Sequence, residues 1–495
     1  MRRIRFCVKF SILLLTAVLI NGCSSTGSYI STEYATKPYV GTTTERAMAY
    51  EGVKRNPLII VHGFLGASLI DIKTKENVWG TFSAAGTISV SADQVKDITH
   101  PMAHNKALKD LKDDVIAERL LETAKISVLG TTFEVNAYKN MIDILIKGGY
   151  VPANKPLPED KKYASMFLFG YDWRRDLPEN AARLQKFIKE KKAYMQKQYE
   201  EQYGIKDYNV QFDVIAHSMG GLVSRYFLRY GDQDLPKDGS MPKLDWGGSK
   251  FIDRLIIVGT PNAGYLDTYL EMIRGGGVHP YPPAALGTLP TYYQMLPAPG
   301  TKSFAYSDDP DGEEIDIFDS RIWEKYKWSL ADPKQDKTLK ILLPDIKSKK
   351  KRYEIALDHL NKCLTRAKQF IKAMQIKASP PDDVKLYLVF GYGVKTTKRA
   401  LINRKTGKID KITYTSGDGK VGSQSALWDE RMRNPKLHFM HSPIDWSHIV
   451  VLRGAHMAIT EIPGFEDNIL FILTMEETKK QVKDLKTIRQ EESVK

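Results

Sequence analysis

The stretch Phe212-Asp213-Val214-Ile215-Ala216-His217-Ser218-Met219-Gly220-Gly221 decides the fold of this 495-residue chain. Its apolar first half predicts a buried strand, and apolar residues at helical spacing follow it, at positions 222, 223, 226 and 227. A serine at such a sharp turn requires small residues two positions before and after it, and here these are Ala216 and Gly220. The stretch therefore predicts a nucleophile elbow with Ser218 at its apex. The alternative is an ordinary strand-to-helix turn that contains a serine.

A serine needs a general base and an orienting acid before it can act as a nucleophile, in the chain order Ser, Asp, His for this kind of elbow. Asp418 lies in the glycine-flanked turn 415–421, after the apolar strand 386–390 and an expected hairpin. We predict that it is the orienting acid, and a plain Asp-Gly turn is the alternative. His456, in the small-residue loop 453–457, is the predicted base, and His448 is its rival by position.

A second backbone donor for an oxyanion is expected from the loop after an early strand. Residues 56–66 fit this position, because Pro57 opens an apolar strand, and Gly63 and Gly66 allow the chain to double back after it. The N–H groups of Phe64 and Met219 are therefore the predicted oxyanion hole.

With these residues in view, the chain resembles the lecithin:cholesterol acyltransferase family, which includes lysosomal phospholipase A2 and the phospholipid:diacylglycerol acyltransferases. Further likeness lies in the "YDWR" segment 171–174, in the strand and loop 251–264, and in the acid loop 416–419. The resemblance covers most of residues 56–300 and 384–460. It implies an α/β-hydrolase fold, with a mostly parallel central sheet, helices on both faces and a cap or lid insertion. His62 stands where the family usually has proline, and the family's cysteine pair near the lid is missing, so hydrolysis is favoured over acyl transfer.

The amino terminus carries a basic segment and then an apolar run from Phe10 to Ile20. This run ends in the stretch Leu19-Ile20-Asn21-Gly22-Cys23. This pattern resembles a bacterial lipoprotein signal and predicts cleavage before Cys23 and lipidation of its thiol. Ser24 then favours an outer membrane, if the organism has one. An uncleaved anchor helix is the alternative. Only Cys363 would remain as a free thiol, and its default role is packing.

Length and pattern favour one large α/β core with insertions. Core strands are expected at 57–62, 165–170, 209–216, 253–259 and 384–391, and helices at 136–147, 179–203 and 219–231. The predicted organisation is a signal peptide (1–22), a flexible linker (23–50), the first part of the core (51–264), a lid or cap insertion (265–382), the second part of the core (383–472) and a charged tail (473–495). The run Gly275-Gly276-Gly277 is the expected hinge of the lid.

Trp79 and Phe82 are candidates for membrane contact, with packing under a loop as the alternative. The formal net charge is +14, and removal of the signal's four basic residues leaves +10. Anionic headgroups attract such a surface, and the run from Lys347 to Arg352 is its densest part. The histidines show no metal-binding spacing, so no metal or other cofactor is expected. Nucleic acid is not an expected partner, and the oligomeric state is left open.

The sequence thus predicts a lipid-anchored protein of the bacterial cell envelope. Its expected activity is that of a serine lipid esterase or acyltransferase of the phospholipase A or O-acyltransferase type, with a lipid substrate and an alcohol as possible acceptor. A triacylglycerol lipase or carboxylesterase is the alternative among enzymes. A catalytically inactive lipid-binding surface lipoprotein is the alternative from another class.

Overall fold

The computed structural model of the chain describes residues 44, 47–48, 52–83, 90–128, 131–276 and 280–474. The predicted signal peptide, Cys23, nearly all of the linker and almost all of the charged tail lie outside these residues. A six-stranded sheet forms the centre, in the order β15-β12-β10-β9-β1-β8, and every neighbouring pair is parallel. Its strands are β1 (Leu58–Val61), β8 (Met166–Phe169), β9 (Phe212–His217), β10 (Ile252–Val258), β12 (Lys385–Tyr392) and β15 (His448–Arg453). The predicted parallel α/β sheet is confirmed.

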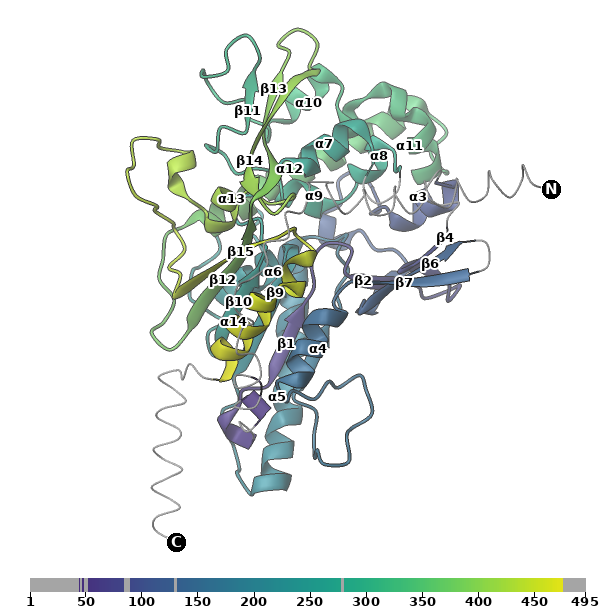
Figure 1. Cartoon of the computed structure of the whole chain (residues 1–495). Coiled ribbons are helices and arrows are strands. Elements are labelled where there is room, and N and C mark those ends of the chain that lie inside the picture. Colours follow the sequence, from purple (N-terminus) through teal and green to yellow (C-terminus); the bar gives the residue numbers. More distant parts are fainter. Residues whose placement is uncertain are drawn as a thin grey trace, which may run out of the picture.

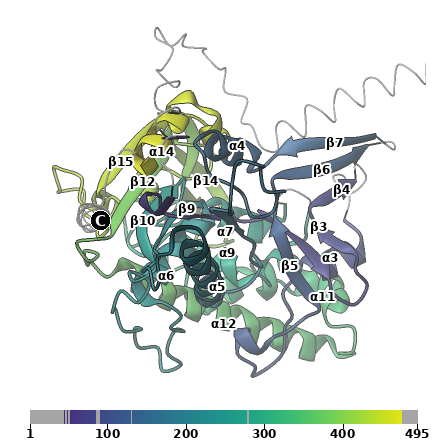
Figure 2. The ribbon, with the colours of Figure 1, turned by 90° about the horizontal axis from the view of Figure 1, so that it is seen from below.

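Helices cover both faces of this sheet, and Figure 2 shows α4 (Lys139–Lys147) and α14 (Pro463–Thr474) on one side, with α5 (Leu177–Tyr203) and α6 (Met219–Tyr230) on the other. All four residues of β1 are buried. Leu58 and Ile60 pack in the cluster that contains α4 and α14, whereas Ile59 and Val61 pack in the larger cluster that contains α5 and α6. A strand buried on both faces reads as a continuous apolar run, which is why β1 was predictable.

The helix boundaries follow from local chemistry. Helix α5 begins at Leu177, before the predicted residue 179, because the Asp176 side chain accepts a hydrogen bond from the Glu179 N–H and Pro178 fits the first turn. It ends before Gly204, which adopts a left-handed conformation. Helix α4 begins at Lys139, after the predicted residue 136, because residues up to 136 belong to strand β7 (Thr131–Asn136).

The segment 265–382 is mostly helical and lies over one end of the central sheet (Figure 1). Its helices are α7 (Asp267–Arg274), α8 (Pro283–Leu286), α9 (Pro290–Gln294), α10 (Ser320–Tyr326), α11 (Asp336–Leu342) and α12 (Lys349–Gln375). Apolar residues recur at helical spacing between Tyr353 and Ile371, and α12 has Leu360, Leu364 and Ile371 buried. The other helices were not predicted, because each is short and separated by prolines, glycines and acidic turns.

The cap is also joined to the core by a sheet. Its strand β11 (Phe304–Tyr306) pairs with β13 (Val394–Ile402), which forms a hairpin with β14 (Ile409–Gly417) that continues from core strand β12. Two further three-stranded sheets lie early in the chain. They are β3-β2-β5, with β2 (Ala67–Asp71), β3 (Asn77–Trp79) and β5 (Val115–Leu120), and β4-β6-β7, with β4 (Thr81–Ser83) and β6 (Thr123–Val128). Within the described residues, no helix combines the length and apolar character needed to cross a bilayer.

Candidate active site

Ser218 lies at the turn between β9 and α6, with φ of 52° and ψ of −125°. A positive φ combined with this ψ lies outside the left-handed helical region and is rarely adopted by residues other than glycine, so the turn is strained. The helix can start there only because positions 220 and 221 carry no side chain. A Cβ on Gly220 would lie 2.3 Å from the His62 carbonyl oxygen, and one on Gly221 would lie 2.0 Å from Thr260 Oγ1. The elbow geometry therefore follows from the Ser-Met-Gly-Gly sequence.

His456 and Asp418 meet Ser218 in a chain of hydrogen bonds. His456 Nε2 lies 2.9 Å from Ser218 Oγ, and His456 Nδ1 lies 2.7 Å from Asp418 Oδ2. Asp418 follows β14 of the separate β11-β13-β14 sheet, whereas His456 follows β15 of the central sheet. The structure thus brings together the three residues that were singled out as nucleophile, acid and base.

Asp418 is held by the backbone on every side. Its Oδ1 accepts N–H bonds from Lys420 (2.9 Å) and Val421 (2.7 Å), and its carbonyl oxygen accepts one from the His456 N–H (2.8 Å). The side chain is only 1% exposed. Because Oδ1 is occupied by two donors, Oδ2 is left to orient the imidazole, and His456 Nδ1 must carry the proton.

His448 does not lie near Ser218. It is the first residue of β15 and is exposed, whereas Ser218 follows the last residue of β9. The strand register places His448 level with Ile215 of β9, and strands β12 and β10 lie between the two, so three strand spacings of about 4.8 Å separate His448 from the strand that carries the elbow.

The loop after β1 passes directly beside the nucleophile. A Cβ on Gly63 would lie 2.7 Å from Ser218 Cβ, so only glycine permits this approach. The Phe64 ring packs edge-on against Trp173 (4.9 Å between ring centroids) and Tyr292 of α9 (5.2 Å). Among the described residues, neither the Phe64 N–H nor the Met219 N–H donates to another group. No acceptor in the described part of the chain therefore occupies either N–H group.

Two buried histidines flank the site. Burial lowers the pKa of His62 to about 4 and the pKa of His217 to about 3. His62 accepts the Tyr171 N–H at Nε2 (3.1 Å), lies 2.7 Å from the Gly63 carbonyl oxygen at Nδ1, and stacks on the Tyr171 ring. His217 lies 3.1 Å from the hydroxyl of Tyr138. Both side chains are neutral at pH 7 and are much weaker bases than an ordinary imidazole, so neither is suited to take the place of His456 as general base.

Tyr138 is a residue of the site that the sequence did not reveal. Its hydroxyl accepts the Gly63 N–H at 2.7 Å and contacts His217, although it lies 75 positions after Gly63 in the chain. No local motif marks it. The "YDWR" segment proves to be structural, since Arg174 is fully buried between Asp172 and Asp113 at 2.8 and 2.9 Å.

Trp79 is 4% exposed, its indole N–H donates to the Leu65 carbonyl oxygen (2.9 Å), and its ring packs against Trp173. It therefore packs inside the molecule, which favours the second of the two interpretations given for it. The side chain of Phe82 and the thiol of Cys23 lie outside what the structure describes. Among the described residues, no group of three or more His, Cys, Asp and Glu side chains could hold a metal ion.

The parallel sheet, the elbow and the helices on both faces define an α/β-hydrolase. Residues 79–282 match the sequence model of the lecithin:cholesterol acyltransferase family, so the resemblance to that family is confirmed over this part of the chain. The family match supports a lipid esterase or acyltransferase as the class of activity.

Solved structures of similar fold include the Tle4–Tli4 complex, with 12% identity, a TM-score of 0.50, and coverage of 84% of this chain and 97% of that chain. EstA from Clostridium botulinum is similar at 13% identity, with a TM-score of 0.35 and coverage of 93% and 97%. The lin2722 gene product from Listeria innocua gives 11% identity, a TM-score of 0.27 and coverage of 86% and 96%. A comparison with curated protein sequences finds no match.

Proposed function

We propose that this chain is a serine-dependent lipid esterase that acts on glycerolipids through an acyl-enzyme. Ser218 Oγ attacks the ester carbonyl carbon while His456 Nε2 takes the hydroxyl proton, and Asp418 stabilises the resulting imidazolium. The carbonyl oxygen becomes an oxyanion that accepts the Phe64 and Met219 N–H groups. When the ester C–O bond breaks, the leaving alcohol takes the proton from His456. Water then attacks the acyl-enzyme by the same route and releases the fatty acid.

The observation that carries this proposal is the unbroken chain from Ser218 Oγ through His456 to Asp418 Oδ2, with contacts of 2.9 and 2.7 Å. Both distances are within the range for a nucleophile and its base. The positive φ of Ser218 supports the proposal independently, because strained backbone conformations cluster at active sites.

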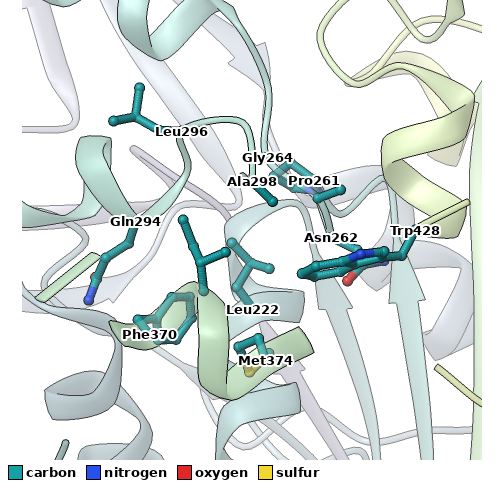
Figure 3. A pocket seen from close by; sticks show the side chains of 12 residues that line it. Leu222, Pro261, Asn262, Gly264, Gln294, Leu296, Ala298, Phe370, Met374 and Trp428 are labelled. Carbon is teal, nitrogen blue, oxygen red and sulfur yellow. The ribbon is translucent and has the colours of Figure 1, made fainter. Parts of the chain in front are cut away.

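One pocket lies between α6 and α12, and it is too small for an acyl chain in this conformation. Figure 3 shows the side chains that line it, with Leu222 of α6 next to Phe370 and Met374 of α12. Its free space is about that of a single water molecule. We therefore propose that α12 and α9 of the cap shift when a lipid chain enters, which places the moving part in these helices rather than in the glycine run alone.

We also propose that the protein works at a membrane, held there by lipidated Cys23 and a basic surface. The loop 433–441 suits such a surface, because Phe439 is 79% exposed and Met440 is 39% exposed. Arg433, Lys436 and His438 beside them are exposed as well. Apolar tips beside the cationic Arg433 and Lys436 fit an interface with anionic headgroups.

The experiment is to incubate the protein with isotope-labelled phospholipid vesicles, with and without an acceptor alcohol, and to identify the products by mass spectrometry. Fluorophosphonate labelling of the same preparation, with Ser218→Ala as control, reports the nucleophile. We expect labelled free fatty acid in both incubations and probe on Ser218. An acyl ester of the alcohol as main product would make the protein a transferase. Cleavage of triacylglycerol or soluble short esters alone would make it a lipase or carboxylesterase. If Ser218 is not labelled and no product forms, the result would favour the alternative of a catalytically inactive lipid-binding protein.

A further inference from the structure

A second chain of hydrogen bonds runs behind the proposed triad. The Gly63 N–H lies 2.7 Å from the Tyr138 hydroxyl oxygen, and that oxygen lies 3.1 Å from His217 Nδ1. On the other side of the ring, His217 Nε2 lies 3.4 Å from the carbonyl oxygen of His456. Tyr138 precedes α4, Gly63 follows β1, His217 ends β9 and His456 follows β15, so four separate segments meet here.

The proton positions in this chain are fixed by the chemistry of its ends. The Gly63 amide can only donate, so the Tyr138 oxygen accepts there and its own proton goes to His217 Nδ1. His217 is neutral, because burial and the nearby His456 lower its pKa to about 3. Its single proton is therefore on Nε2 and faces the His456 carbonyl oxygen, which can only accept. The direction of every bond is consistent from Gly63 to His456.

Two parts of the proposed reaction depend on these ends. Gly63 precedes Phe64, whose N–H is one of the two donors for the oxyanion, and its Cα approaches Ser218 so closely that a Cβ would lie 2.7 Å from Ser218 Cβ. His456 is the proposed base. The Tyr138–His217 pair thus connects the loop of the oxyanion hole with the loop of the base, through the residue that precedes the nucleophile.

We propose that Tyr138 is a positioning residue for this reaction. With His217 it holds the loop after β1, which contains Phe64, and the loop after β15, which contains His456, in position beside Ser218. This inference rests on the proposed function. Neither side chain touches the substrate. Without the tyrosine hydroxyl, the Gly63 N–H and His217 Nδ1 lose their partners inside the protein, and both loops can relax away from the geometry that the transition state requires.

The test is the variant Tyr138→Phe, assayed with a soluble short-chain ester so that no membrane step intervenes. Loss of one oxyanion donor costs about 10²- to 10³-fold in kcat, and here the donor is loosened rather than removed. We expect kcat to fall roughly 10- to 100-fold, with KM changed less than about threefold because ground-state binding does not use these groups. The affinity for a trifluoromethyl ketone, whose tetrahedral adduct places an oxyanion in the same position, should fall in parallel with kcat/KM.

Tyr230→Phe is the matched control. Its hydroxyl also donates a buried hydrogen bond, to the Ala373 carbonyl oxygen at 2.7 Å, but it lies at the far end of α6 from Ser218. We expect this variant to lose a similar amount of thermal stability while its kcat stays at the wild-type value. A purely structural role for Tyr138 would make the two variants alike in both measurements.

A double-mutant cycle with His217→Gln tests whether the groups act as one chain. The glutamine amide can still reach toward the His456 carbonyl oxygen, but it offers no acceptor at the position of Nδ1. Each variant removes the Tyr138–His217 bond, so the double variant should lose no more than the larger of the two single losses.

Several results would overturn the inference while wild type remains active. These are a Tyr138→Phe kcat within twofold of wild type, a loss that falls entirely on KM, or losses that multiply in the double variant. A wild-type protein that turns over no ester and is not labelled at Ser218 would instead overturn the proposed function, and this inference with it.

Discussion

Replacing Asp418 by asparagine tests the geometry of the site most directly, because the structure dictates how the new side chain must sit. Oδ1 is bound by the N–H groups of Lys420 and Val421, and an oxygen must remain there. The new NH₂ group then occupies the position of Oδ2, 2.7 Å from His456 Nδ1, and it donates to that nitrogen. The imidazole proton is forced onto Nε2, which faces Ser218 Oγ at 2.9 Å. In this tautomer His456 cannot accept the serine proton.

The expected loss is large. Fixing the wrong tautomer of a triad histidine lowers kcat by about 10⁴-fold, which is about 5.5 kcal/mol in the activation free energy. The fold should survive, because asparagine is isosteric and keeps both backbone hydrogen bonds. Hydrolysis of a soluble p-nitrophenyl ester gives kcat, and the rate of fluorophosphonate labelling reports the reactivity of Ser218 separately. Both should fall together, while near-UV circular dichroism and Tm stay close to those of wild type.

Asp429→Asn is the control, because Asp429 is a fully buried carboxylate in the same part of the chain that is paired with Arg431. Its variant is expected to lose stability but to keep kcat within about threefold, since the residue is not in the hydrogen-bond chain. A folded Asp418→Asn protein with kcat within tenfold of wild type would refute the assignment of Asp418 as the orienting acid.

Four further predictions concern the nucleophile, the base, the anchor and the cap. Ser218→Ala should lower kcat by about 10⁶-fold without loss of fold, measured with the same ester. His456→Ala should lower kcat by several orders of magnitude, whereas His448→Ala should leave it unchanged, because β12 and β10 separate its strand from β9. Cys23→Ser should release the protein from the membrane fraction and remove its attached fatty acid, as cell fractionation and mass spectrometry can show. His359 is buried on α12 with Nε2 2.9 Å from the Thr288 carbonyl oxygen, and burial lowers its pKa from 6.5 to about 4. The unfolded chain therefore binds more protons between these values, and the free energy of unfolding should fall by about 1.4 kcal/mol for each pH unit below 6.5 from this histidine.

Each of these predictions has a result that contradicts it. Near-normal turnover by Ser218→Ala would remove the proposed nucleophile, and a greater loss with His448→Ala than with His456→Ala would exchange the bases. Full-length protein in the soluble fraction without fatty acid would rule out the anchor. Urea unfolding at pH 7.5 and 5 gives the free energy of unfolding at each pH. This free energy should fall more between the two pH values for wild type than for His359→Gln, and an equal fall would contradict the prediction for His359.

The central strands and the elbow could be predicted because their signals are local. β1 and β9 are continuous apolar runs, and the glycines around Ser218 meet a steric demand that the structure shows at 2.0 and 2.3 Å. Strand β15 was not predicted, because it lacks such a local signal. It is an edge strand in which only Val450 is buried, so its sequence lacks the apolar run that marks the inner strands.

Features that depend on distant pairs could not be read from the sequence. Tyr138 gains its role from contacts with Gly63 and His217, 75 and 79 positions away. Trp79 was a candidate for membrane contact, because the residues near it in the sequence do not indicate that its ring packs against Trp173. In the cap, α8 and α9 are short, and they are helical because their buried residues pack on the core rather than because of their own periodicity.

The position of β15 has a consequence for biosynthesis. It is the last strand of the sheet to be made, it pairs only with β12, and it carries the loop that presents His456 to Ser218. A nascent chain can build the other five strands and the elbow without possessing the proposed base. If the proposed chemistry holds, a ribosome-bound product that stops before His456 is harmless to the lipids of the cell that makes it, and the ability to cleave them arises only once the segment that carries His456 has been translated.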